Sequence, residues 1–176
     1  FDRIFIVDNC STDGTPEYLK EQGWMDDARF AYLKTHANIG GAGGFYTGTK
    51  AAYEAGADYI VLMDDDGRAS DGHTFENLLR EAERLHAENP KLFVNSLVRP
   101  GELLSFKMGS KYTVAEALAA AKNSILDGEA NPFNGTLVSR ELVAEIGYPN
   151  PDFFIKGDEV NYKQRAFDAG ARVVTV

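Results

Sequence analysis

Apolar runs of strand length alternate with helical patterns along the whole chain. Six runs have the length and composition of buried strands, at residues 3–7, 30–34, 59–63, 92–97, 136–139 and 172–176. Strands that alternate with helices are typical of α/β proteins, in which helices cover a largely parallel sheet. The pattern therefore predicts an α/β fold with a mostly parallel sheet flanked by helices.

The helices between these runs are marked by apolar spacing and by capping residues. Apolar residues recur at three- and four-residue steps over 74–88 and predict a helix that stops before Pro90. Thr113 and Glu116 have the spacing of a capping box, which predicts a helix from there to Lys122. The other predicted helices begin at Pro16 behind a Thr15 cap and span 44–55, 140–146 and 159–169.

The composition is that of a globular domain. The chain has 176 residues, of which 44% are hydrophobic, and a chain of this length buries about two-thirds of its unfolded surface. It can therefore fold without disulfides or a structural metal. Its single cysteine, Cys10, excludes a disulfide framework and a cysteine-based zinc site, and we expect a reducing compartment.

The net charge of −9 narrows the classes of partner. A negative surface repels phosphate backbones, so nucleic acid is not expected as a ligand. No apolar run approaches the roughly 18 residues of a membrane helix, which predicts a soluble chain. Because the chain begins with Phe1 and its first residues already have the pattern of a strand, we expect it to be a piece of a longer protein.

The strongest chemical signal follows the apolar run at 59–63. Asp64, Asp65 and Asp66 stand side by side before Gly67. Alternate side chains of an extended backbone share a face, so Asp64 and Asp66 are expected to converge on one point. Two ionised carboxylates at such a short separation repel each other, and a hard divalent cation such as Mg²⁺ or Mn²⁺ would compensate their charge. The alternative is a solvated acidic loop.

Two further polar segments, 8–15 and 38–44, follow the first and second predicted strands. Asp8 or Asn9 could hydrogen-bond a base or a ribose, and glycines such as those of 38–44 let backbone N–H groups approach an anion closely. Ligands of parallel α/β proteins sit at this end of the strands. Both segments also suit structural roles, the first as a turn with a helix cap and the second as a glycine-rich turn that packs a helix on the sheet.

A second acidic pair, Asp158 and Glu159, opens the last predicted helix behind an apolar segment. A carboxylate partly shielded by Phe153 and Phe154 would have a raised pKa and could take a proton from a hydroxyl group. The alternative is that Asp158 is an N-cap and Glu159 a first-turn acid stabilised by the helix dipole.

Taken in order, these segments resemble the family 2 glycosyltransferases of GT-A fold, and among them the bacterial rhamnosyl- and galactofuranosyltransferases. The resemblance covers nearly the whole chain and rests on residues 8–15, 38–45, 62–66, Phe133-Asn134-Gly135, and 153–159 with Arg165. It implies inverting, metal-dependent transfer of a rhamnose- or galactofuranose-like sugar from a nucleotide-diphosphate donor. The implied acceptor is a hydroxyl group of a glycan or a lipid-linked glycan, in bacterial polysaccharide or cell-wall biosynthesis.

The resemblance also implies roles for individual residues. Asp64 and Asp66 match the outer positions of the family's DXD motif, which holds Mn²⁺ or Mg²⁺ on the donor diphosphate. The pair Asp158-Glu159 matches the motif that carries the catalytic base; Glu159 is the preferred base and Asp158 stays open. The residues expected beside the nucleotide-sugar are Asp8, Asn9, Asn38, Gly40, Gly41, Gly43 and Asp65.

Two departures from the family pattern concern the ends of the chain. The family's first strand would precede Phe1, and a metal-ligand histidine that family members often carry would follow the strand at 172–176. Residues 1–176 are therefore expected to form a single but incomplete catalytic domain, with weak or no transfer in isolation. The implied donor is a UDP- or dTDP-sugar. The implied location is the cytoplasm, at the inner face of the membrane through regions outside the chain.

Two other functions are alternatives. Asp64-x-Asp66-Gly67 also resembles the nucleophile motif of haloacid-dehalogenase-type phosphatases. The segment that begins with Gly157-Asp158 resembles their later acidic motif. Two observations oppose the phosphatase interpretation. Arg68 and Tyr162 stand where the phosphatase motifs have other residues, and the segments 8–15 and 38–44 would have no role in a phosphatase. The second alternative is a catalytically inactive carbohydrate-binding domain, which retained acidic pairs do not favour.

Overall fold

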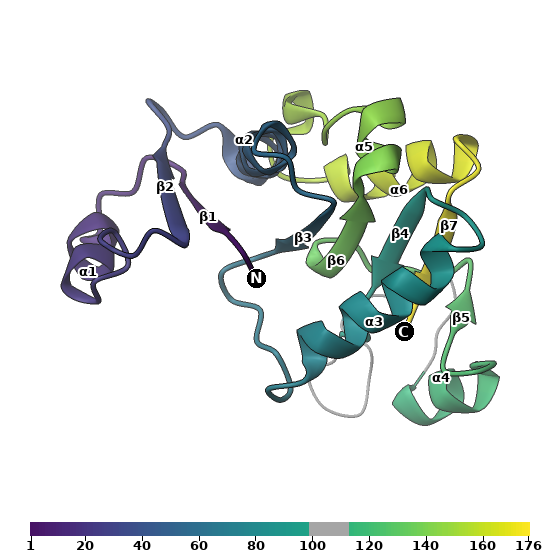
Figure 1. Ribbon diagram of the computed structural model, residues 1–176. Helices are drawn as coiled ribbons and strands as arrows, with labels where there is room; N and C mark the ends of the chain where they lie inside the picture. The colour runs from purple at the N-terminus through teal and green to yellow at the C-terminus, as the bar shows by residue number, and fades with distance from the viewer. Residues whose placement is uncertain (99–112) are drawn as a thin grey trace. The chain divides into compact units, whose positions relative to one another are not determined.

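The computed structural model describes residues 1–98 and 113–176, whose contacts group them into two units. Unit 1 consists of Phe1–Ala57 and Tyr148–Asn161, and unit 2 consists of Asp58–Gly147 and Tyr162–Val176. Figure 1 shows the elements of each unit, which are described separately. Within the described ranges, no helix is both long enough and apolar enough to cross a membrane.

Unit 1 is built on two parallel strands in which Asp8 is paired with Lys34. This pairing places the ends of the two strands, and the polar residues that follow them, side by side. The elements of the unit are β1 (Ile4–Asp8), α1 (Thr15–Glu21), β2 (Phe30–Lys34), α2 (Gly40–Glu54), the 3₁₀ turn η1 (Pro151–Phe153) and the first residues of α6 (Asp158–Asp168).

Both helices that follow the strands of unit 1 begin earlier than the sequence predicts. Helix α1 starts at Thr15 rather than Pro16, and its N-cap is Gly14 in the left-handed region with φ 88°. The predicted Thr15 cap is wrong, because the Thr15 hydroxyl donates backward to Asp13 at 2.6 Å. Helix α2 starts at Gly40 rather than residue 44, so the glycine-rich segment is helical. Because glycine has a low helix propensity, the sequence pattern did not predict this first turn of the helix.

Unit 2 contains a sheet of five strands in the order β3-β6-β4-β7-β5 (Figure 1). Only β4 and β7 are parallel among its described pairings, and the pairs β3–β6, β4–β6 and β5–β7 are antiparallel. The α/β class is confirmed, but this sheet is mixed rather than mostly parallel. The elements are β3 (Tyr59–Met63), α3 (Thr74–His86), β4 (Leu92–Asn95), α4 (Val114–Ala120), β5 (Leu126–Asp127), β6 (Asn134–Ser139), α5 (Arg140–Ile146), the rest of α6 and β7 (Arg172–Thr175).

The core of unit 2 lies between the sheet and α3. Leu78 and Leu85 of α3 pack with Leu92 and Val94 of β4, and all four side chains are buried. Burial of each such side chain contributes about 2 kcal/mol to the stability of the fold, which outweighs the small cost of a residue with low helix or strand propensity at a single position. The core fixes the central strands of unit 2, and the loop after β3 carries the acidic run 64–66.

Candidate functional site

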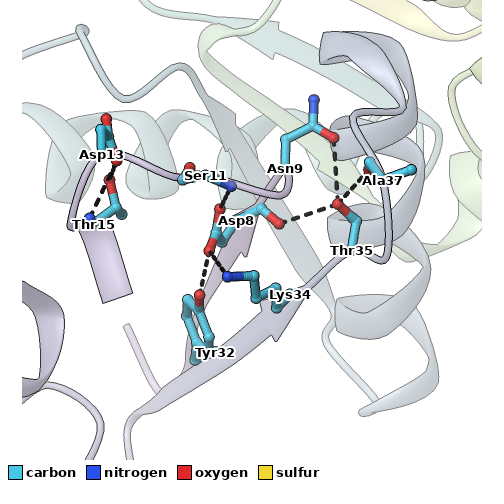
Figure 2. Close-up of polar contacts among 9 residues, drawn as sticks. All are labelled: Asp8, Asn9, Ser11, Asp13, Thr15, Tyr32, Lys34, Thr35 and Ala37. Atoms are coloured by element: carbon cyan, nitrogen blue, oxygen red, sulfur yellow. Dashed lines mark hydrogen bonds and ion pairs between the residues drawn. The ribbon is translucent and has the colours of Figure 1, made fainter. Parts of the chain in front are cut away.

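Asp8 is the last residue of β1, and both oxygens of its buried carboxylate have protein partners (Figure 2). Its oxygens accept the backbone N–H of Ser11 at 2.7 Å and the hydroxyl of Tyr32, and Lys34 Nζ lies 3.8 Å away. Burial acts to raise the pKa of Asp8, but the hydrogen bonds from Ser11 and Tyr32 outweigh it and hold that pKa below its ordinary value. Burial and the same contact raise the pKa of Tyr32 to about 12.

Asn9 links the end of β1 to the segment before α2. Its Oδ1 accepts the backbone N–H of Ile39 at 2.8 Å, and its Nδ2 donates to Asn38 Oδ1 at 3.0 Å. Asn38 Oδ1 also accepts the N–H of Gly40 at 2.9 Å. Three residues expected to bind a nucleotide-sugar, Asn9, Asn38 and Gly40, are thus brought together by the parallel pairing of β1 and β2.

Two glycines of α2 are required by close packing within unit 1. A Cβ on Gly40, whose φ is 73°, would lie 2.0 Å from the backbone oxygen of Phe154, and a Cβ on Gly43 would lie 2.6 Å from Ile39 Cγ1. Phe154 O also accepts the N–H of Ala42 at 3.0 Å. The N–H groups of Gly40 and Ala42 therefore already have protein partners, whereas Gly41 is exposed with open space around it. Close packing against Phe154 and Ile39, rather than against the sheet as the structural alternative supposed, accounts for Gly40 and Gly43.

The acidic pair at the start of α6 has one buried and one partly exposed member. Asp158 is only 4% exposed, and Glu159 accepts the N–H of Gly157 at 3.0 Å. Burial, together with the hydrogen bond and the charge of Glu159, raises the pKa of Asp158 to about 6. A raised pKa was expected from shielding by Phe153 and Phe154, which are themselves 39% and 48% exposed.

Asp64 lies just beyond β3, where the chain leaves the extended conformation. The N–H of Gly67 donates to Asp64 O at 3.3 Å and closes a turn over Asp64–Gly67. The expectation that an extended backbone directs Asp64 and Asp66 to one face is therefore wrong. Asp64 is half-buried, and Asp65 and Asp66 are exposed.

The side chain of Asp64 is fixed by the start of β6. Asn134 Nδ2 donates to Asp64 Oδ2 at 3.0 Å, and the N–H of Asp64 donates to Phe133 O at 3.1 Å. In the described ranges no three His, Cys, Asp or Glu side chains are grouped so that they could hold a metal ion. Mg²⁺ commonly binds one or two carboxylates plus substrate phosphates and water. In chemical type, Asp64 and Asp66 match such a set, in which a bound phosphate would supply further oxygens.

Sequence reasoning missed the residues that position these groups. Tyr32 and Lys34 lie at alternate positions of β2, so they share a face and both reach Asp8. This spacing is visible in the sequence, but only the strand register connects it to Asp8. Asn134 belongs to a motif visible in the sequence, but its contact with Asp64, 70 positions away, depends on the antiparallel pairing of β3 with β6.

Comparisons with known proteins identify the chain's relatives. A family model described as "Glycosyl transferase family 2" matches residues 1–96, which include Asp8, Asn38 and the acidic run 64–66. The galactofuranosyltransferase GlfT1 of Mycobacterium tuberculosis is 33% identical over 172 residues, which cover 96% of this chain and 56% of that protein. The chain therefore spans about half the length of the curated relatives it matches.

Solved structures agree on the fold. The chain superposes on GalNAc-T7, crystallised with UDP, GalNAc and Mn²⁺, with a TM-score of 0.70 at 11% identity, covering 99% of this chain and 36% of that one. It superposes on Staphylococcus aureus TarS residues 1–349 in complex with UDP with a TM-score of 0.64 at 13% identity, covering 99% of this chain and 48% of that one. These similarities confirm the expected GT-A fold.

The same comparisons decide between the two enzyme classes considered for the acidic run. Asp64-x-Asp66-Gly67 lies inside the residues matched by the glycosyltransferase model, so it is part of a glycosyltransferase domain rather than a phosphatase motif. Because that model spans more than half of the 176 residues and a galactofuranosyltransferase matches 96% of them at 33% identity, the chain belongs to glycosyl transferase family 2.

Proposed function

We propose that this chain is the catalytic part of a metal-dependent, inverting glycosyltransferase. The donor is a UDP- or dTDP-linked sugar of the rhamnose or galactofuranose type, and the acceptor is a hydroxyl group of a glycan or a lipid-linked glycan. The galactofuranosyltransferase relatives and the complex of TarS with UDP support this choice. The setting is bacterial polysaccharide or cell-wall synthesis in the cytoplasm, at the inner face of the membrane through regions outside this chain.

The observation that carries the proposal is the carboxylate of Asp64, which Asn134 holds just beyond β3, two residues before the exposed Asp66. In this proposal the two side chains hold Mn²⁺ or Mg²⁺, which would neutralise the charge that develops on the departing nucleotide diphosphate. The neighbouring Asp65 contacts the nucleotide-sugar. The net charge of −9 adds a long-range repulsion toward an anionic donor, which a bound cation would locally reduce.

The acidic pair of α6 supplies the base. Asp158 is buried, whereas Glu159 is the more accessible member of the pair. Glu159 then removes the proton from the acceptor hydroxyl, whose oxygen attacks the sugar carbon as the bond to the diphosphate breaks. Asp158 remains the alternative base.

The nucleotide is bound by the loops of unit 1. Since both oxygens of Asp8 have protein partners, Asp8 contributes by holding the turn after β1 in place. Asn9 and Asn38 bring that turn to the start of α2, where Gly41 leaves open space for the donor, while Gly40 and Gly43, which pack against Phe154 and Ile39, set the course of the backbone around it.

Donor binding tests the metal role. We expect isothermal titration of UDP- and dTDP-sugars to show binding that requires Mn²⁺, and Asp66→Asn to weaken it at least about tenfold. Asp26→Asn, which neutralises another exposed aspartate, is the control and should leave the affinity unchanged. Equal donor affinity in Mn²⁺ and in chelator would contradict the metal role.

Transfer by the protein with its full chain tests the base. Glu159→Gln keeps the size of the side chain but cannot accept a proton, so we expect donor affinity to be retained and transfer to be lost. Donor affinity is measured by calorimetry and transfer by product formation. If transfer survives, the base is another residue. Donor binding without transfer by the unaltered protein, over a panel of acceptors, would favour the inactive carbohydrate-binding alternative.

A further inference from the structure

The segment before β6 holds Asp64 by its backbone and by its side chain. Phe133 O accepts the N–H of Asp64 at 3.1 Å, and Asn134 Nδ2 donates to Asp64 Oδ2 at 3.0 Å. The other side of the Asn134 amide lies against the turn that follows Asp64, because a Cβ on Gly67 would be 3.0 Å from Asn134 Oδ1. The rotation of the Asp64 carboxylate is thus restricted by one amide that is itself confined.

A buried hydroxyl and a buried amide fix the segment that carries Asn134. Thr136 Oγ1 accepts the N–H of Phe133 at 2.7 Å and donates to Asn95 Oδ1 at 2.5 Å. Asn95 Nδ2 donates to the backbone oxygen of Asn131. Thr136 and Asn95 are fully buried, and Phe133 is held with φ 73°, a conformation that non-glycine residues adopt only when their surroundings enforce it.

We propose that Asn134 is a positioning residue for the cation-binding carboxylate of Asp64, and that the buried Thr136–Asn95 pair sets its place. This inference rests on the proposed function, in which Asp64 binds the donor's metal ion. A carboxylate whose second oxygen is already hydrogen-bonded presents its other oxygen in a defined direction, which lowers the cost of ordering it around a cation. Nothing in the Phe133-Asn134-Gly135 motif by itself assigns this role.

The experiment measures Mn²⁺ affinity of the full chain in saturating UDP. We expect Asn134→Ala to weaken Mn²⁺ binding by about tenfold or more, as the loss of an outer partner of a metal ligand commonly does. Asp64→Asn should weaken it further still. In the double variant, Asn134→Ala should add no loss to that of Asp64→Asn, because the amide acts only through that carboxylate.

Variants of Thr136 separate positioning from general destabilisation. Thr136→Val removes the hydroxyl and should weaken Mn²⁺ binding severalfold. Thr136→Ser retains the hydroxyl, so its Mn²⁺ affinity should stay close to that of the unaltered chain. Ser139→Ala is the matched control, because Ser139 is a buried residue of the same strand whose hydroxyl donates to Pro90 O at 2.7 Å. It should lower the melting temperature but leave Mn²⁺ affinity within about twofold.

The outcomes distinguish this inference from the proposed function. Mn²⁺ binding by the unaltered chain that Asn134→Ala leaves unchanged would overturn the positioning role alone. An additive loss in the double variant, or equal effects of Thr136→Val and Ser139→Ala on Mn²⁺ affinity, would overturn it as well. No Mn²⁺ binding by the folded, unaltered chain in UDP would overturn both the metal role of Asp64 and the inference.

Discussion

The buried carboxylate of Asp8 shows how a single residue can be charged without being exposed. Burial alone would favour its protonated form, but a backbone N–H and a tyrosine hydroxyl favour the ionised form and prevail. Because the pKa of Asp8 is lowered on folding, its contribution to stability is present above its ordinary value of 3.8. That contribution is lost as the pH falls through the lowered value of the folded state.

Removal of one donor tests this account. We expect Tyr32→Phe to lower the free energy of unfolding at pH 7 by about 1–2 kcal/mol, because a buried carboxylate loses a hydrogen bond. The difference from the unaltered chain should begin to shrink below about pH 4, the ordinary value of an aspartate, and shrink further as the pH falls through the lowered pKa of folded Asp8. Urea denaturation at pH 7 and pH 3 measures both effects. The exposed Tyr18→Phe is the control, and an equal effect of the two variants at pH 7 would contradict the role of Tyr32.

The pKa of Asp158 is shifted in the opposite direction from that of Asp8. Its pKa is raised to about 6 in the folded state, so its favourable contribution is present below the ordinary value of 3.8 and is lost as the pH rises through about 6. We expect Asp158→Asn to raise the melting temperature at pH 8, by a stability gain on the order of 1 kcal/mol, and to give no gain at pH 4. Thermal unfolding at the two pH values measures this.

The control for that experiment is an exposed acid of the same unit. Asp152→Asn neutralises a carboxylate of η1 and should leave the difference between pH 4 and pH 8 as it is in the unaltered chain. A loss of stability in Asp158→Asn at pH 8 would show that the folded state favours the ionised form instead.

At the scale of elements, the start of α2 is set by packing rather than by propensity. Glycines weaken a helix, yet this one begins with four of them in five residues because Phe154 and Ile39 occupy the space that side chains at Gly40 and Gly43 would need. The loop that leads to the acidic pair is thereby attached to α2 within unit 1.

Two neighbouring glycines of α2 should respond differently to alanine. Gly40→Ala adds a Cβ 2.0 Å from a backbone oxygen at a positive φ, and we expect it to cost about 3 kcal/mol or more. Gly41→Ala meets nothing within 4 Å, so its effect should lie between neutral and a gain of about 1 kcal/mol. Chemical denaturation of both variants measures this contrast, and similar costs at the two positions would refute the packing account.

Sequence reasoning missed the strand β5 altogether. It has two residues, Leu126 and Asp127, and no strand-like run of its own. A tight hairpin leads into it, with Asn123 and Ser124 at φ 51° and 65° between the paired Lys122 and Ile125. Antiparallel pairing with β7 holds the strand in place, which no local pattern records.

At the scale of the whole molecule, local patterns located most elements but not their partners. Helix α5 spans the predicted 140–146, and β2 and β3 have their predicted bounds, because apolar spacing and capping residues act within a few positions. The direction of pairing in the sheet of unit 2 was not predictable in this way. It depends on which strands meet, and β6 joins β3 and β4 antiparallel although it looks like any other buried strand.

The sequence by itself determined the α/β class, the family resemblance and the chemical identity of the candidate groups, because residue types and their order along the chain carry that information. Only the tertiary structure decided which groups have partners: Tyr32 and Ser11 saturate Asp8, Phe154 confines Gly40, and Asn134 holds Asp64. Apart from that of Ser11, these contacts join residues far apart in the chain. Their energies depend on burial and distance, which exist only once the strands have paired.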